Sequence, residues 1–173
     1  GFFTNSFNGR KADKEESVGA RMGLEWMISP QFKAIYNFSF DYSEQGAFPY
    51  GLYNPETKET AAVSINDSST YNRRMIGNQL RLEYKSNQFT LSSTTGYRHL
   101  KDNMNMDQDF SPLSIFTLNQ KQKQNAFSQE IALKSNQPTN YQWSVGLYGF
   151  YDDLHTDGPG TFKEDGVKTV LQS

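Results

Sequence analysis

The segment Phe32-Lys-Ala-Ile-Tyr-Asn-Phe-Ser-Phe-Asp-Tyr-Ser43 decides the fold class, because apolar and polar residues alternate along it. Side chains alternate between the two faces of a strand, so one face carries only apolar and aromatic side chains: Phe32, Ala34, Tyr36, Phe38, Phe40 and Tyr42. The other face is polar except for Ile35. The run is as long as a tilted membrane-spanning β-strand, about 9–11 residues, whereas strands of soluble proteins are usually nearer 5–6. The segment therefore favours the wall of a transmembrane β-barrel.

The composition agrees with a barrel wall and excludes several other classes. The chain has 173 residues, which we interpret as one domain over 1–173, and its net charge of -2 gives no basic face for nucleic acid. Mean hydropathy is -0.76, too polar for a helical membrane protein, yet aromatic residues make up 14%. Only half of each barrel strand faces lipid, and aromatic girdles flank that band. The chain has no Cys, so it has no thiolate site and no disulfide.

The sequence predicts three antiparallel hairpins, each closed by a short turn rich in Ser, Asn, Gln or Pro. Their strands are expected at about Val18–Ile28 with Phe32–Ser43, Met75–Lys85 with Phe89–Arg98, and Phe127–Lys134 with Tyr141–Tyr151. The turns are Ser29–Gln31, Ser86–Gln88 and Ser135–Asn140, and Phe2–Phe7 is expected to be a strand end.

Long polar connections are expected between the hairpins, at Glu44–Asn72, at His99–Gln124 and from Asp152 onward. Short turns at one rim and long loops at the other are typical of outer-membrane barrels. The predicted fold is therefore all-β: an antiparallel up-and-down meander, part of a transmembrane β-barrel with short periplasmic turns and long extracellular loops.

The alternation also assigns side chains to two environments. The lipid-facing set is expected to be Trp26, Tyr36, Phe38, Phe40, Leu82, Trp143 and Leu147. The charged residues that alternate with such positions are expected to face the lumen or a plug: Arg21, Glu25, Arg81, Glu83, Arg98 and Glu130. Lateral ion pairing between neighbouring strands is the equally open alternative for these six charges.

Aromatic residues in the two long connections are candidates for ligand contact in extracellular loops: Phe48, Tyr50, Tyr53, Phe110 and Phe116. Exposed loop aromatics can stack on a ligand, and they can also pack a small core of the loop itself.

The sequence offers no catalytic or metal site. The histidines, His99 and His155, have no carboxylate cluster with metal-ligand spacing, and the acidic pairs lack the pattern of a calcium loop. No Ser-His-Asp set and no phosphate-binding glycine loop is present, so we expect neither an enzyme nor a cofactor.

Three stretches resemble the TonB-dependent outer-membrane receptors of the siderophore-receptor type. Gly19-Ala-Arg-Met-Gly-Leu-Glu-Trp26 with Ser29-Pro30 is similar to an early barrel hairpin of that family, and Leu91-Ser-Ser-Thr-Thr-Gly-Tyr-Arg98 resembles its "T-x-Y-R" strand. Phe127-Ser-Gln-Glu-Ile-Ala-Leu-Lys-Ser135 with Trp143-Ser-Val-Gly-Leu-Tyr-Gly-Phe-Tyr-Asp-Asp153 is the most specific match. It departs from the family pattern at Ile131 and Ala132, where Leu and Arg are usual.

The resemblance implies a barrel of about 22 strands occluded by a plug, located in the bacterial outer membrane and energised by the TonB complex through that plug. It implies import of a scarce ligand such as a ferric siderophore. We expect the chain to be an internal barrel fragment, with the plug and the later strands absent. The alternatives are a passive porin-like channel and a soluble carbohydrate-binding or adhesion β-domain.

Overall fold

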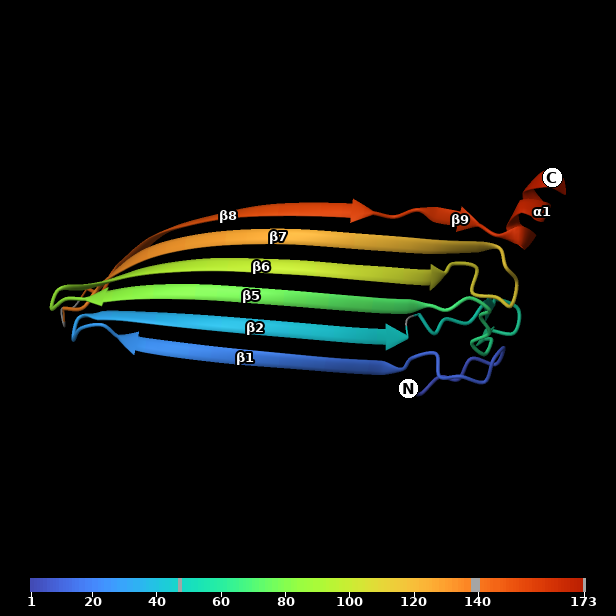
Figure 1. Ribbon diagram of the computed structural model, residues 1–173, viewed down its shortest axis with the longest axis horizontal. Helices are drawn as coiled ribbons and strands as arrows, with labels where there is room; N and C mark the ends of the chain where they lie inside the picture. The colour runs from blue at the N-terminus through green and yellow to red at the C-terminus, as the bar shows by residue number, and fades with distance from the viewer. Residues whose placement is uncertain (47, 138–140, 173) are drawn as a thin grey trace.

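The computed structural model describes residues 1–46, 48–137 and 141–172, and most of them form one antiparallel β-sheet (Figure 1). Its long strands are β1 (Glu15–Met27), β2 (Phe32–Gly46), β5 (Thr70–Lys85), β6 (Phe89–Asp107), β7 (Phe116–Ser135) and β8 (Ser144–Asp157). The shorter elements are β3 (Tyr53–Asn54), β4 (Glu59–Thr60), β9 (Gly160–Phe162) and α1 (Glu164–Gln172).

The strands follow one another as a meander in the order β1-β2-β5-β6-β7-β8, with β9 paired to β7. The three predicted hairpins are confirmed as β1–β2, β5–β6 and β7–β8. Two turns use the same device, in which a serine hydroxyl accepts a hydrogen bond from the backbone N–H three residues later. Phe32 donates to Ser29 at 3.0 Å, and Phe89 donates to Ser86 at 3.0 Å. Of the third turn, residues 138–140 lie outside the described residues.

The predicted extent of all three long connections was wrong, because the strands continue well past the apolar segments. The stretch His99–Gln124 is mostly strand: β6 runs to Asp107, β7 begins at Phe116, and only 108–115 connect them. Phe116 therefore begins a strand and does not lie in a loop. The chain from Asp152 onward continues β8 to Asp157 and then forms β9 and α1.

The predicted connection Glu44–Asn72 is shorter than expected, because β2 runs to Gly46 and β5 begins at Thr70. It contains the small β3–β4 hairpin. The segment Phe2–Phe7 was expected to be a strand end, yet it makes only an isolated bridge between Thr4 and Lys11. The bridge joins two positions within the first 11 residues, so the segment adds no strand to the sheet.

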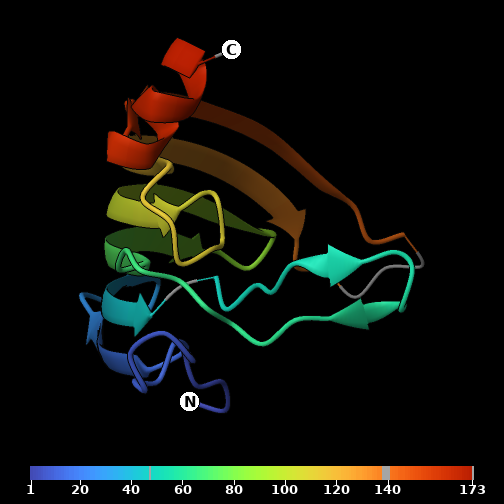
Figure 2. The same cartoon turned by 90° about the vertical axis from the view of Figure 1, so that its right-hand side faces the viewer.

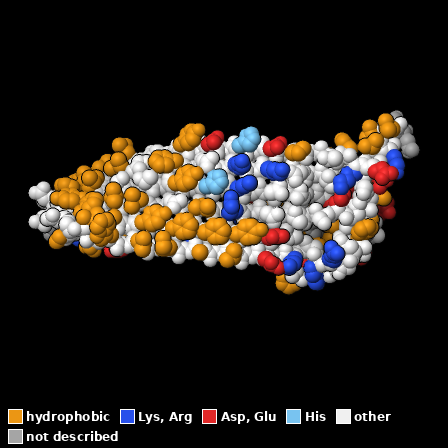
Figure 3. Space-filling model, viewed as in Figure 1, with side chains coloured by type: hydrophobic (Ala, Val, Ile, Leu, Met, Phe, Trp, Pro, Cys, Tyr) orange, Lys and Arg blue, Asp and Glu red, His pale blue; other side chains and the backbone are white. Residues whose placement is uncertain are grey.

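Register places the two sets of side chains on opposite faces of the sheet. Residues directly opposite in an antiparallel pair share a face, so Met22, Phe38 and Asn78 lie on one face, and Gly23, Asn37 and Gln79 lie on the other. We name the first the apolar face. It carries the seven residues that the sequence assigned to lipid, with Trp143 placed by its alternation with Val145. Figure 3 looks onto this face, where hydrophobic side chains cover the half nearer the short turns.

No described residue covers the apolar face. Trp26 is 68% exposed and Leu147 is 79% exposed, and other large hydrophobic residues of this face are also exposed. Among the described residues the buried hydrophobic core consists of Val63 and Ile65, which lie in the β2–β5 connection. The sheet therefore has no core of its own on either side.

The sheet arches toward its other face, which we name the polar face. Figure 2 shows the strands nearly end-on, with the apolar face to the left and β7 and β8 curling toward the right. The β3–β4 hairpin projects to the same side as this curl, beyond the end of the sheet. Among the described residues, no helix has the length and apolar character needed to cross a membrane.

Candidate functional site

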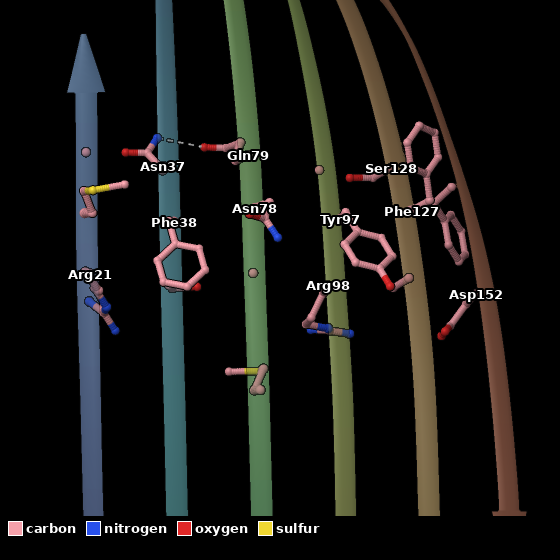
Figure 4. Close-up of a pocket in the computed structure, with 18 of the residues that line it drawn as sticks. Arg21, Asn37, Phe38, Asn78, Gln79, Tyr97, Arg98, Phe127, Ser128 and Asp152 are labelled. Carbon is pink, nitrogen blue, oxygen red and sulfur yellow. Dashed lines mark hydrogen bonds between the residues drawn. The ribbon is translucent and has the colours of Figure 1, made fainter.

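The polar face brings together all six charged residues that the sequence assigned to it. Ile35 of β2 lies between Glu25 of β1 and Arg81 of β5 in register, and Glu130 lies opposite Thr94 and Tyr148, all on this face. Arg21 and Arg98 belong to one register row, which runs from β1 through Ser39, Gly77 and Ala126 to Asp152 of β8. Figure 4 shows Arg21, Arg98 and Asp152 at the same level of three different strands.

An open hollow of about 760 Å³ lies along this row, between the two arginines and the curled strand β8. Its floor includes the glycines Gly77 and Gly96, each of which lies close to a serine hydroxyl of the neighbouring strand. A Cβ added at Gly77 would approach the Ser39 hydroxyl to 2.6 Å, and one at Gly96 would approach the Ser128 hydroxyl to 2.6 Å. Tyr148 and Phe150 of β8 line one side of the hollow.

Ion pairing accounts for only part of the charge on the polar face. Arg81 pairs with Glu83 of its own strand at 2.9 Å, and Glu25 pairs with Lys33 of the neighbouring strand at 3.6 Å. Arg21, Arg98 and Glu130 make no ion pair with any described residue. Asp152 accepts a hydrogen bond from the Gln124 amide at 2.7 Å. Two unpaired guanidinium groups beside an open hollow can bind carboxylate or phosphate groups.

Three of the five candidate loop aromatics meet at the loop end of the sheet. The Tyr50 ring lies 6.0 Å from the Phe48 ring and 5.3 Å, edge-on, from the Phe110 ring. Phe48 and Phe110 both have positive φ, at 62° and 52°, which is uncommon and costly for a bulky residue. Tyr50 is 53% exposed, so this aromatic cluster (Phe48, Tyr50, Phe110) presents a ring to solvent.

The two remaining candidates lie elsewhere. Tyr53 is in β3 and is exposed, and it makes no ring contact with a described residue. Phe116 packs on Phe162 of β9 with ring centroids 5.0 Å apart. Its role is therefore to join β9 to the sheet.

A hydrogen-bonded framework ties the N-terminal segment to the β2–β5 connection. The Asn5 amide donates to the Ile65 carbonyl at 2.7 Å and its oxygen accepts from the Ile65 N–H at 3.1 Å. Ser6 donates to the Val63 carbonyl twice, through its N–H at 2.8 Å and its hydroxyl at 2.9 Å. These bonds surround the small buried pair Val63 and Ile65 and join the N-terminal segment to the connection.

Further contacts tie the same connection to the β6–β7 connection and to the segment before α1. Lys163 forms an ion pair with Asp67 at 2.7 Å, and the Asn66 amide donates to the Ser114 hydroxyl at 2.7 Å. The four segments at the loop end therefore form one connected layer.

Asp107 lies fully buried beneath this layer, at the end of β6. Burial raises the pKa of the Asp107 carboxyl, and the nearby Asp109 and Asp67 raise it further. The Asp67 N–H donates to it at 3.3 Å, while its other carboxylate oxygen has no partner among the described residues. The Asp107 carboxyl lies at the loop end of the sheet, outside the half of the strands that carries the apolar side chains.

Sequence reasoning missed Asp152, Tyr148 and Phe150 as lining residues of the hollow. Asp152 was taken for the start of a loop. Tyr148 and Phe150 alternate with Leu147 and Gly149, and this alternation is the sequence signal that could have placed them on the polar face. Among the described residues, no group of three or more His, Asp or Glu side chains is arranged to hold a metal ion.

Comparison with known protein families and with curated proteins gives no match to this chain. The assignment of function therefore rests on the two faces of the sheet and on its loop end.

Proposed function

We propose that this chain forms part of the wall of a β-barrel in the bacterial outer membrane, within a TonB-dependent receptor that imports a scarce ligand such as a ferric siderophore. The observation that carries the proposal is the apolar face, which no described residue covers. Soluble monomers rarely expose contiguous apolar patches larger than a few hundred Å². Lipid chains are the surroundings in which such a face is stable.

The dimensions support the same proposal. The apolar residues of β2 extend from Phe32 to Tyr42, which is about 33 Å along a strand that rises about 3.3 Å per residue. A strand tilt of about 40° reduces this to about 25 Å, the height of the apolar band of outer-membrane barrels. The long strands have 13 to 20 residues, beyond the usual range of about 3–10 in globular proteins.

The receptor part of the proposal draws on the polar face and the loop end. A curved sheet with its polar side inward gives a lumen, and the hollow with Arg21 and Arg98 is suited to hold acidic groups of a plug segment. The aromatic cluster at the loop end is placed to meet a ligand from outside. A plugged barrel has no open path, so import needs work supplied by a TonB complex.

The two tryptophans of the chain, Trp26 and Trp143, test the membrane part directly. Both are on the apolar face near the short turns, so brominated phosphatidylcholine should quench their fluorescence once the barrel that contains the chain, with its other tryptophans replaced, is folded into vesicles. Iodide in the aqueous phase should quench them little. Tryptophans quenched by iodide alone, in a chain that stays monomeric without detergent, would instead favour a soluble carbohydrate-binding domain.

The receptor part is tested by ligand uptake into cells that express the chain within its barrel. Uptake should stop when an uncoupler removes the proton-motive force. Tyr50→Ala should weaken ligand binding, because Tyr50 is the central ring of the aromatic cluster. Tyr53→Ala is the matched control, since Tyr53 is exposed and lies outside that cluster. Uptake that ignores the uncoupler and rises linearly with concentration would favour a passive channel.

A further inference from the structure

A row of cations crosses three neighbouring strands on the apolar face, directly beyond its hydrophobic half. Register places Arg74 of β5 opposite Lys101 of β6, and Lys101 opposite Lys123 of β7. Lys121 follows two residues further toward the loop end of β7. We name Arg74, Lys101, Lys121 and Lys123 the basic row. Figure 3 shows Lys and Arg side chains gathered in a column at this border.

The basic row forms no ion pair with a described residue. All four side chains are exposed, and none makes an ion pair or a side-chain hydrogen bond with a described residue. Register places Asp157 of β8 opposite Lys121, without an ion pair between them, while Arg74 lies opposite Tyr42 and Lys123 lies opposite His155. Like charges directly opposite one another on a sheet are destabilising. An arrangement of three such positions in register therefore calls for an external anion.

The position of the row identifies the source of that anion. From Tyr84, near the short turns, to Arg74 the strand spans about 33 Å, or about 25 Å at a tilt of about 40°. The row thus lies one membrane thickness from the opposite border of the apolar band. It faces outward, on the same face as Tyr36 and Phe40, and so cannot serve a ligand in the lumen. Lipid headgroups are what surround a barrel at this height.

We propose that the basic row binds phosphate groups of anionic lipid headgroups at the outer border of the membrane. Neighbouring strands are about 4.8 Å apart, so one phosphate can be shared by two adjacent cations. The guanidinium of Arg74 adds a bidentate donor, and the long lysine stems can lie along apolar surface while their ammonium groups reach the headgroups. This inference rests on the proposed membrane location and adds a lipid specificity to it.

The test is the stability of the barrel that contains the chain, folded into vesicles of phosphatidylcholine with or without lipid A, a phosphorylated glycolipid. Lipid A should raise the urea midpoint, and Lys101→Gln/Lys123→Gln should remove that gain. The expected loss is about 30-fold in the unfolding equilibrium constant, which corresponds to about 1 kcal/mol per cation. Lys85→Gln/Lys134→Gln removes the same charge from the polar face and should keep the gain, since both lysines are exposed and unpaired among the described residues.

Three further arms separate the possible outcomes. Lipid A without its phosphates, and inorganic phosphate added in solution, should give no stabilisation, and high salt should abolish the effect on the unaltered chain. A urea midpoint that is the same with and without lipid A would overturn the inference and leave the proposed membrane location standing. A barrel containing the chain that folds into neither vesicle would overturn both.

Discussion

The substitution Phe38→Arg places a charge in the middle of the apolar band and measures whether that face meets lipid. Phe38 lies between Met22 of β1 and Asn78 of β5, four residues from Tyr42 and six from Phe32. An Arg or Lys at the midplane of a barrel costs about 2–4 kcal/mol. Removing the Phe side chain from an apolar environment adds about 1.5–3 kcal/mol. The total loss should therefore be about 3.5–7 kcal/mol of the free energy of unfolding.

Asn37→Arg is the matched substitution on the polar face, one residue away. It loses the hydrogen bond from the Asn37 amide to the Gln79 side chain, at 3.3 Å, which is worth about 0.5–1.5 kcal/mol. Its neighbour across β1 is Gly23, so the new side chain has room.

The assay is urea unfolding, in phosphatidylcholine vesicles, of the barrel that contains the chain with either substitution, followed by tryptophan fluorescence. Phe38→Arg should be less stable than Asn37→Arg by about 2 kcal/mol or more, which is roughly thirtyfold in the equilibrium constant. Equal stability of the two variants would refute the assignment of the apolar face to lipid.

Three more predictions concern the loop end and the orientation of the sheet. Asn5→Ala should lose about 1–3 kcal/mol, because it leaves the buried N–H and C=O of Ile65 without partners, and faster amide exchange at Ile65 would report it. Because the folded-state pKa of Asp107 is raised, the layer should gain stability as pH falls through that pKa and lose it as pH rises. Asp107→Asn should therefore stabilise the loop end at neutral pH and flatten the pH dependence of its thermal unfolding. The same pH dependence in the variant and in the unaltered chain would show that the buried Asp107 carboxyl is not its cause. A cysteine at position 64 should be labelled from outside whole cells and one at position 86 should not, and the reverse would invert the topology.

The hairpins could be predicted because their alternation and turns are local signals. In β2 the aromatic residues mark every second position, and Ser29 and Ser86 mark turns that close on a single hydroxyl. The division of charges between the faces followed from the same period, which is why Arg21 and Arg98 were placed correctly relative to Phe38.

The length of the strands could not be predicted, because the apolar signal ends before the hydrogen-bonded ladder does. Residues Lys121-Gln-Lys-Gln-Asn125 have the composition of a loop, yet each is paired with β6. A ladder is made by backbone groups and needs no apolar face, so a strand in water on both sides carries no period of two in hydrophobicity. The basic row lies in such a stretch of β6 and β7 and was missed for that reason.

The aromatic cluster illustrates a different limit. Its formation depends on the positive φ of Phe48 and Phe110, a conformation that bulky residues rarely adopt and that sequence patterns do not encode. Composition identified Tyr50 as a candidate, and only the folded connection places it between the other two rings.

The edges of the sheet bear on the same proposal as its faces. Every residue of β1 and of β8 is exposed, and each of these strands pairs with the sheet along one side. The unpaired N–H and C=O groups of an edge have no partner in hydrocarbon, where each costs several kcal/mol. The apolar face is stable against lipid, but the unpaired backbone groups of an open edge are not. Both conditions hold together only if β1 and β8 pair with further strands and the curvature closes the sheet.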